Sequence, residues 1–268
     1  MDTSRTDAYL LRIGAERPAA PTSAALRDLH LAHLRTVPFE NLAIHAGEEV
    51  DLVEEDLLTK VVDGRRGGFC YELNGAFAAL LTSLGFEVEM LQASVYQGDR
   101  LGIPYDHMAL RVRTADGGDW LADVGFGKHS HYPLAFGERG DQSDPGGTFR
   151  VAETPDGDLR VLMGGEPQYL LDPRPRALAD FTGGAWYHRT SPKSHFTRSL
   201  VCSILTGTGR ATLSGSRLTV TPHGGEPQVT ELATDADVLE AYATRFGIAL
   251  DAVPRLATPV RVGGVLAT

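Results

Sequence analysis

The stretch RRGGFCYELNG, residues 65–75, places a cysteine where a glycine-rich turn leads into a helix. Gly67 and Gly68 allow the backbone to turn tightly. Apolar residues then recur at helical spacing, at Leu73, Phe77, Leu80, Leu81 and Leu84, and Gly85 supplies a C-terminal cap. The pattern predicts a helix with Cys70 in or just before its first turn. Unsatisfied N–H groups and the positive end of the helix dipole favour a thiolate there.

Cys70 has two interpretations at this stage, a small buried apolar residue or a nucleophile. The chain has only one other cysteine, Cys202, and two cysteines are too few for a disulfide framework. We therefore expect free thiols in a reducing compartment. A nucleophilic Cys70 would need a histidine to accept its proton and a third group to orient that histidine.

The first 85 residues are predicted to be helical. Thr22 and Ser23 can cap a helix that ends before Pro38, and its apolar face comprises Leu26, Leu29, His33, Leu34 and Val37. A second helix is expected over LVEEDLLTKVV, residues 52–62, and should stop at Gly64. With the helix after Cys70, these segments predict a helical bundle over residues 1–85.

The hydrophobic period changes to two from Phe86 onward, which predicts strands. His107 opens one such strand, and Asp123 lies in the next, facing away from its apolar neighbours. Because a two-residue turn at Gly117-Gly118 does not place these two residues directly opposite each other, we expect an asymmetric or bulged hairpin. Short strands and turns predict an antiparallel barrel over residues 86–190, with an exposed loop at residues 141–147.

The last part, residues 191–268, has a mixed pattern. We expect a helical stretch at SHFTRSLVCSIL (194–205), a hairpin at RATLSGSRLTVT (210–221) and a helix from Asp235. No repeat or low-complexity linker separates the three parts, so they should pack closely as one α+β protein.

Nine histidines could serve as the partner of Cys70. His30 and His33 lie on a predicted helix, and His129 and His131 flank a predicted loop. These pairs lack Cys, Asp or Glu at ligand spacing, so no metal site is expected. His107 differs because a strand would hold it rigidly at a sheet end. For Asp123, a solvated strand aspartate is the competing interpretation.

Charge and hydropathy exclude other classes. The net charge is −10, and no basic run exceeds Arg65-Arg66, so we expect no nucleic-acid partner. The start MDTSRTDAYLLRIG lacks the features of a signal peptide, and no stretch approaches ~18 uninterrupted apolar residues. We therefore expect a cytoplasmic protein without membrane contact. The strong preference for arginine over lysine hints at a GC-rich bacterial source.

Five segments together resemble the arylamine N-acetyltransferases: VPFENL, RGGFCYELN, HMALRV, DVGFG and SPKSHFTRSLVC. They occur in the family's order across most of the chain. The resemblance implies a helical bundle, a β-barrel and an α/β lid, with a catalytic core like that of papain-like proteases and transglutaminases. It also implies a Cys70, His107 and Asp123 triad, acetyl-CoA as acyl donor without a tightly bound cofactor, and aromatic amines or hydrazines as acceptors.

Further roles follow from the same resemblance, position by position. Arg66 resembles the arginine that pairs with the acid of PFENL, here Glu40, with Asn41 assisting, which would lock the cysteine loop onto the bundle. The candidate substrate and acyl-donor pocket comprises Phe39, Val95, Phe126, Gly127 and Phe196, with Gly127 allowing close approach of the donor. Asp106 departs from the family, which often has a hydroxyl or small residue beside the histidine.

Three alternatives stay open on the sequence. A branch of the family closes macrolactams as amide synthases, taking a polyketide thioester from an acyl carrier protein and an aryl amine from the same molecule. A cysteine protease or transglutaminase-like enzyme would use the same triad. A catalytically inactive binding protein of the same fold would keep Cys70 unreactive.

Overall fold

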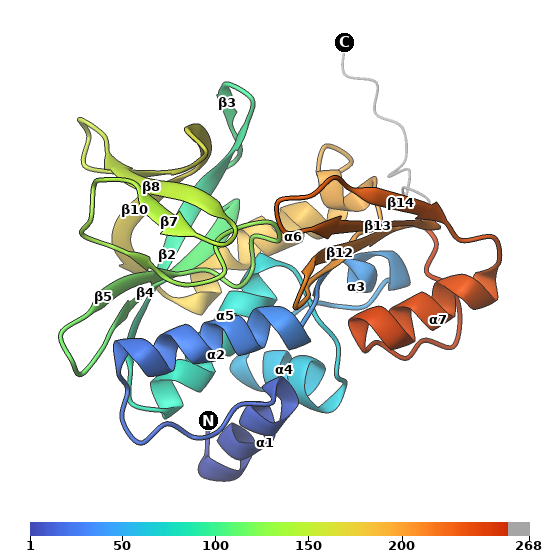
Figure 1. The fold of residues 1–268 in the computed structure, drawn as a ribbon, viewed down its shortest axis with the longest axis horizontal. Coiled ribbons are helices and arrows are strands. Elements are labelled where there is room, and N and C mark those ends of the chain that lie inside the picture. The colour runs from blue at the N-terminus through green and yellow to red at the C-terminus, as the bar shows by residue number, and fades with distance from the viewer. Residues whose placement is uncertain (257–268) are drawn as a thin grey trace.

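The helix expected after the glycine turn is α5 (Cys70–Ser83), and it forms the buried centre of the helical part of the molecule. The computed structural model describes residues 1–256 and shows an α+β fold (Figure 1). Around α5 lie α1 (Thr3–Ile13), α2 (Ser23–Thr36), α3 (Leu42–Ala46), α4 (Glu54–Leu58) and the π-helical turn η1 (Thr59–Asp63). Within the described residues, no helix combines the length and the apolar character that a membrane crossing requires.

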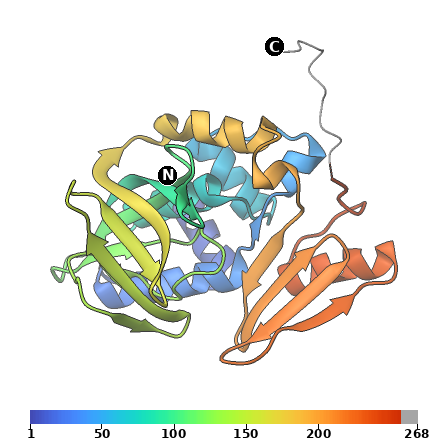
Figure 2. The same ribbon diagram turned by 90° about the horizontal axis from the view of Figure 1, so that it is seen from above.

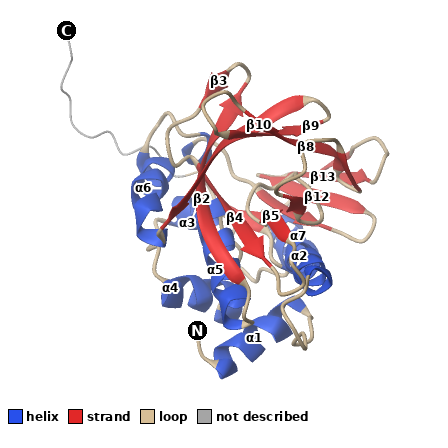
Figure 3. Ribbon diagram, turned by 90° about the vertical axis from the view of Figure 1, so that its left-hand side faces the viewer, coloured by secondary structure: helices blue, strands red, loops and turns tan. Residues whose placement is uncertain are grey.

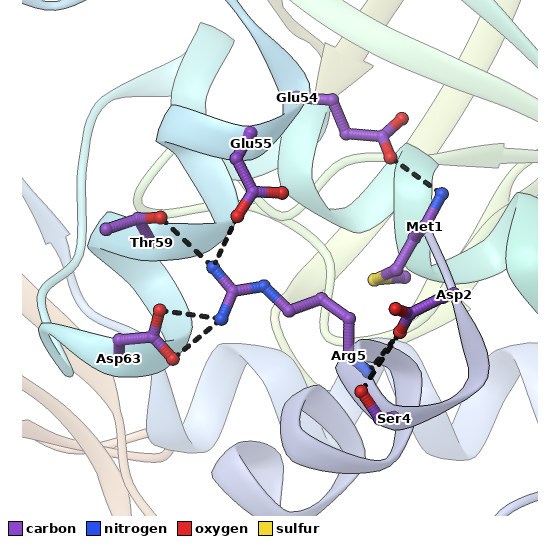
Figure 4. Close-up of polar contacts among 8 residues, drawn as sticks. All are labelled: Met1, Asp2, Ser4, Arg5, Glu54, Glu55, Thr59 and Asp63. Atoms are coloured by element: carbon purple, nitrogen blue, oxygen red, sulfur yellow. Dashed lines mark hydrogen bonds and ion pairs between the residues drawn. The ribbon is translucent and has the colours of Figure 1, made fainter.

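Helix α1 is fastened to α4 and η1 by Arg5 (Figure 4). Its guanidinium lies 2.6 Å from a carboxylate oxygen of Asp63 and 3.3 Å from Glu55, and it donates to the Thr59 hydroxyl at 3.0 Å. The N-terminal amino group also pairs with Glu54 at 2.8 Å. These contacts hold the chain just before the turn that carries Cys70.

The central sheet has nine antiparallel strands and closes almost completely into a barrel (Figure 3). Its strands, in spatial order, are β6 (Leu134–Ala135), β5 (Asp119–Ala122), β4 (His107–Arg113), β2 (Glu87–Gln97), β10 (Glu166–Arg176), β9 (Leu159–Met163), β8 (Gly147–Glu153) and β7 (Gln142–Asp144), with β3 (Arg100–Leu101) beside β2. The Gln142 side chain joins the two edges, because it accepts from the Ala135 N–H at 2.7 Å and donates to the Ala135 carbonyl at 3.0 Å. The prediction of an exposed loop at residues 141–147 is wrong, because Gln142–Asp144 within it form β7.

A second antiparallel sheet lies on the other side of the molecule (Figure 2). Its order is β1 (Phe39–Glu40), β11 (Cys202–Leu205), β12 (Gly209–Ser214), β13 (Arg217–Pro222) and β14 (Gln228–Glu231), and its core includes residues of α7 (Asp235–Phe246). The helix η2 (Leu178–Phe181) and α6 (Thr182–Thr190) connect the two sheets. The expected hairpin at 210–221 and the helix from Asp235 are confirmed. Residues 257–268 of the expected lid lie outside the described residues.

The helical stretch expected at 194–205 is wrong. Only a 3-10 turn, η3 (His195–Thr197), forms there, and the chain then continues as β11. Ser203 pairs with Phe39 and Cys202 with Glu40, more than 150 positions away in sequence. This distant pairing overrides the local helical spacing, which is only a weak preference.

Glu40 joins the helical part, the second sheet and the cysteine turn. Its carboxylate is fully buried, accepts from the Leu42 N–H at 2.7 Å and pairs with Arg66 at 3.0 Å. Its backbone N–H donates to the carbonyl of Gly68 at 2.9 Å. A side chain at Gly67 would lie 1.8 Å from the Pro38 carbonyl oxygen, so this close approach requires glycine. The cysteine turn is thereby fixed against β1.

We expect Arg66→Ala to lower the free energy of unfolding by about 3–5 kcal/mol, because it leaves the buried Glu40 carboxylate without its counter-charge. Urea denaturation measures the difference. Arg150→Ala is the matched control, since Arg150 pairs with Asp141 where both side chains are at least half exposed, and it should cost at most about 1 kcal/mol. Equal losses in the two variants would contradict the structural role of Glu40 and Arg66.

Candidate active site

Cys70 is the first residue of α5, as the sequence predicts, and it lines a cavity of about 730 Å³ between the barrel, α6 and η3. Its residue surface is 4% exposed. The sulfur lies 4.0 Å from the Asp106 carbonyl oxygen. His107 opens β4, also as predicted, and lines the same cavity as Cys70.

His107 and Asp123 form a buried pair, with Nε2 of His107 2.7 Å from a carboxylate oxygen of Asp123. This leaves Nδ1 as the ring nitrogen that can face the thiol. The predicted position of Asp123 within a strand is wrong, because β5 ends at Ala122. Strands β4 and β5 pair Leu110 with Ala122, so a continued ladder would place Asp123 opposite Ala109. Asp123 reaches the imidazole because the chain leaves the ladder at that point.

Two residues that sequence reasoning missed hold Asp123 in place. Asn74 donates to its other carboxylate oxygen at 3.0 Å and to the Met108 carbonyl at 2.7 Å, and accepts from the Val124 N–H at 2.9 Å. His30 accepts from the Asp123 N–H at 3.2 Å through Nε2, so its Nδ1 donates to the His131 carbonyl. Asn74 lies four positions after Cys70, hence on the same helix face, and that spacing is the signal that could have identified it.

The charges of the pair stabilise each other. Burial by itself would lower the pKa of His107, because it disfavours the charged imidazole. The adjacent Asp123 carboxylate outweighs this effect and raises the pKa to about 10. Burial likewise opposes the charged carboxylate, and His107 with Asn74 nevertheless holds the pKa of Asp123 below its usual range. At neutral pH the arrangement therefore keeps a negative charge on Asp123 and a positive charge on the His107 imidazole beside the thiol.

The pKa of the Cys70 thiol is raised, whereas the sequence led us to expect a stabilised thiolate. Burial is the strongest influence and raises the pKa of Cys70, while interactions with His107 and the Met108 N–H oppose this rise without overcoming it. The expectation of a lowered pKa omitted burial, because the helix start and a nearby histidine can be inferred locally whereas the enclosure of the sulfur cannot. Deprotonation of Cys70 thus depends on the adjacent imidazole.

Comparisons with known proteins agree with this geometry. A family model described as N-acetyltransferase matches residues 22–254. The arylamine N-acetyltransferase of Mycolicibacterium smegmatis is 36% identical over 97% of this chain and 98% of that protein. This chain belongs to the arylamine N-acetyltransferase family. It is therefore an acyltransferase-type enzyme, and the family expected from its sequence is confirmed.

Solved structures of other family members have the same fold as this chain. The arylamine N-acetyltransferase from Salmonella typhimurium superposes with a TM-score of 0.86 at 30% identity, covering 97% of this chain and 96% of that one. The Mycobacterium marinum arylamine N-acetyltransferase, solved in complex with CoA, gives a TM-score of 0.81 at 33% identity, covering 91% and 92%. The α+β class with bundle, barrel and C-terminal sheet is the fold of this family.

The structure brings most of the predicted pocket residues together. Phe39, Val95, Phe126 and Phe196 line the cavity that contains Cys70, but Gly127 does not. The close approach of an acyl donor at Gly127 stays a prediction. A different close contact occurs at Gly125, where a side chain would lie 2.7 Å from the Cα atom of Cys70, so glycine there allows the loop after β5 to reach the cysteine.

Of the predicted supporting residues, Arg66 and Glu40 form the expected pair, whereas Asn41 acts elsewhere. Its side chain donates to the carbonyls of Phe196 at 3.0 Å and Ser199 at 2.6 Å. It also accepts from the Val201 N–H at 2.9 Å. Asn41 thus ties the helical part to the segment that carries Phe196, rather than to the cysteine turn.

His129 and His33, two of the other histidines considered from the sequence, are buried among other side chains. Burial lowers the pKa of His129 to about 4, and its ring lies between those of Phe149 and Tyr169. Burial also lowers the pKa of His33, which contacts the Tyr9 hydroxyl at 3.0 Å. Across residues 1–256 no three His, Cys, Asp or Glu side chains gather where they could hold a metal ion.

We expect iodoacetamide to modify Cys70 and leave Cys202 unmodified in the native protein, because Cys70 lines the cavity while Cys202 is fully buried in β11. In His107→Ala the pH midpoint of Cys70 alkylation should rise by about one unit or more, since burial remains while the neighbouring cation is lost. Peptide mass spectrometry across a pH series measures both effects. An unchanged midpoint would contradict the pairing of Cys70 with His107.

Proposed function

We propose that this enzyme transfers an acetyl group from acetyl-CoA to an aromatic amine or hydrazine through an acetyl-cysteine intermediate. The carrying observation is that Cys70 and His107 line one cavity and that Asp123 pairs with His107 at 2.7 Å. The names of the relatives supply the reaction class, and the M. marinum structure shows CoA bound to a family member. The aromatic wall of the cavity suits a planar acceptor.

In the first half-reaction Cys70 attacks the carbonyl carbon of the thioester as a thiolate, whose negative charge the protonated His107 stabilises. Backbone N–H groups at the start of α5 stabilise the oxyanion. The bond to the donor sulfur then breaks, and the donor leaves as a free thiol after receiving the proton from His107. The enzyme is left with an acetyl group on Cys70.

In the second half-reaction the amine nitrogen attacks the acetyl carbon and His107 accepts its proton. The carbon–sulfur bond to Cys70 breaks and the amide is released. Asp123 orients the imidazole and stabilises its positive charge throughout. The two products leave in separate steps, so the kinetics are ping-pong.

Incubation with acetyl-CoA in the absence of amine should add one acetyl group to Cys70, because the first half-reaction needs no acceptor. Intact-mass and peptide mass spectrometry measure the adduct. Cys70→Ser is the control and should remain unmodified.

Three outcomes would change the proposal. No adduct with acetyl-CoA but one with longer or carrier-bound acyl thioesters would favour the amide synthase. A Cys70 that reacts with no thioester and no alkylating agent would favour an inactive binding protein. Labelling at Cys202 would refute the site assignment.

Asp123→Asn should lower acyl transfer by roughly 10³- to 10⁴-fold. The amide lacks the negative charge that keeps His107 protonated, so the cation that stabilises the Cys70 thiolate is lost. Asp106→Asn should retain most of kcat, because the Asp106 carboxylate contacts His188 at 2.9 Å and lacks a bond to His107. Steady-state kinetics with one thioester and one aryl amine compare the two variants. An Asp123→Asn enzyme that is more active than Asp106→Asn would refute the assignment of Asp123.

A further inference from the structure

A second histidine–aspartate pair lines the same cavity and takes no part in the proposed reaction. Nε2 of His188 lies 2.9 Å from a carboxylate oxygen of Asp106, and Nδ1 lies 3.1 Å from the Ser194 hydroxyl. All three residues are less than 8% exposed. The ring is oriented like that of His107, with Nε2 toward the carboxylate and Nδ1 toward the hydroxyl or thiol.

These three residues join three separate elements. Asp106 directly precedes β4, and its second carboxylate oxygen accepts from the Val95 N–H of β2 at 3.2 Å. His188 belongs to α6, and Ser194 caps η3. Helix α6 packs closely on the loop before Asp106, because a side chain at Gly184 would lie 2.3 Å from the Tyr105 carbonyl oxygen. The barrel edge that carries His107 is thereby bound to α6 and η3.

Phe196 is the cavity residue that this network holds. The Ser194 hydroxyl oxygen accepts from the Phe196 N–H at 3.2 Å. The His188 ring meets the Phe196 ring edge to face, with centroids 5.2 Å apart. The Phe196 ring also lies 5.9 Å from that of Phe39 and 6.0 Å from that of Phe69. Phe196 is therefore fixed by its backbone and by three neighbouring rings.

The hydrogen bonds of the network are satisfied internally. With its proton on Nε2, His188 donates to Asp106 and accepts from the Ser194 hydroxyl, whose oxygen in turn accepts from Phe196. Satisfied buried polar networks restrict a site to one arrangement. The network consequently presents an ordered aromatic ring to the cavity.

We propose that His188, with Asp106 and Ser194, is a positioning residue that holds Phe196 in the cavity wall and so determines how well the acylated enzyme accepts an aromatic ring. The part of this role that concerns the acylated enzyme rests on the proposed function. The role concerns the aromatic wall of the cavity, where the Phe196 ring packs against those of Phe39 and Phe69. Ser194 is not assigned as a second nucleophile, since its oxygen already has two partners and the residue is 2% exposed.

The test compares two alkylating agents at Cys70, iodoacetamide and its N-phenyl derivative, and needs no acyl donor. In the wild type an ordered Phe196 ring should favour the aryl reagent. In Ser194→Ala the rate ratio of aryl to small reagent should fall about 3- to 10-fold, while the iodoacetamide rate changes less than twofold. His188→Phe should lower the same rate ratio. Because that change also removes the hydrogen-bond partner of the buried Asp106 carboxylate, Ser194→Ala is the decisive variant.

Ser194→Thr keeps the hydroxyl and should restore the wild-type ratio. Trp186→Ala is the control on the same helix, because Trp186 is 64% exposed and does not line the cavity. If the protein also acetylates amines, Ser194→Ala should raise KM for the aryl amine with little change in kcat. A failure of acetyl transfer alone would refute the proposed function and leave the alkylation ratios as the test of the positioning role.

Three results would overturn the proposal. One is an unchanged reagent ratio in Ser194→Ala with intact folding. Another is an equal loss of rate for both reagents, which would mean that the network supports Cys70 generally. The third is an acetyl group on Ser194 in the Cys70→Ala variant after incubation with acetyl-CoA, which would make Ser194 a nucleophile.

Discussion

The buried negative charge of Asp123 is the constraint on which the rest of this site depends. A carboxylate that is 2% exposed is tolerated only when it is paired and hydrogen-bonded. Its partners come from distant parts of the chain: His107 from β4, Asn74 from α5 and the Gly125 N–H from its own loop. His30 of α2 also accepts from its backbone N–H. Satisfying one charge therefore brings two helices and the barrel to a common point, and Cys70 lies at that point.

Burial has opposite consequences for the members of this site. It raises the pKa of the Cys70 thiol, which reduces the thiolate available to attack. The same enclosure strengthens the attraction between His107 and Asp123, which raises the pKa of the imidazole to about 10. Reactivity is therefore a property of the three residues together. The cysteine alone, in this environment, would be an inert buried thiol.

Two further polar junctions hold the walls of the cavity. Glu40 and Arg66 fix the cysteine turn against β1, while Asn41 and the Asp106–His188–Ser194 network both bind the segment around Phe196. Both junctions cross between parts of the chain that are separate in sequence. Asp106, which directly precedes His107, is thus paired with a histidine on α6.

The sequence alone determined the features that depend on neighbouring residues. The period of the apolar residues and the glycine turn predicted a helix with Cys70 in or just before its first turn. Alternation predicted a strand opened by His107, and both signals are readable because they repeat within a few positions. The tertiary structure decided what depends on distant pairing. Residues 202–205 form a strand because β12 pairs with all four of them and β1 pairs with Cys202 and Ser203. Asn41 binds within residues 196–201, and Asp123 reaches His107 only because the chain leaves β5. The pKa of Cys70 also belongs to this second group, because desolvation is set by every element that encloses the sulfur and no local pattern records it.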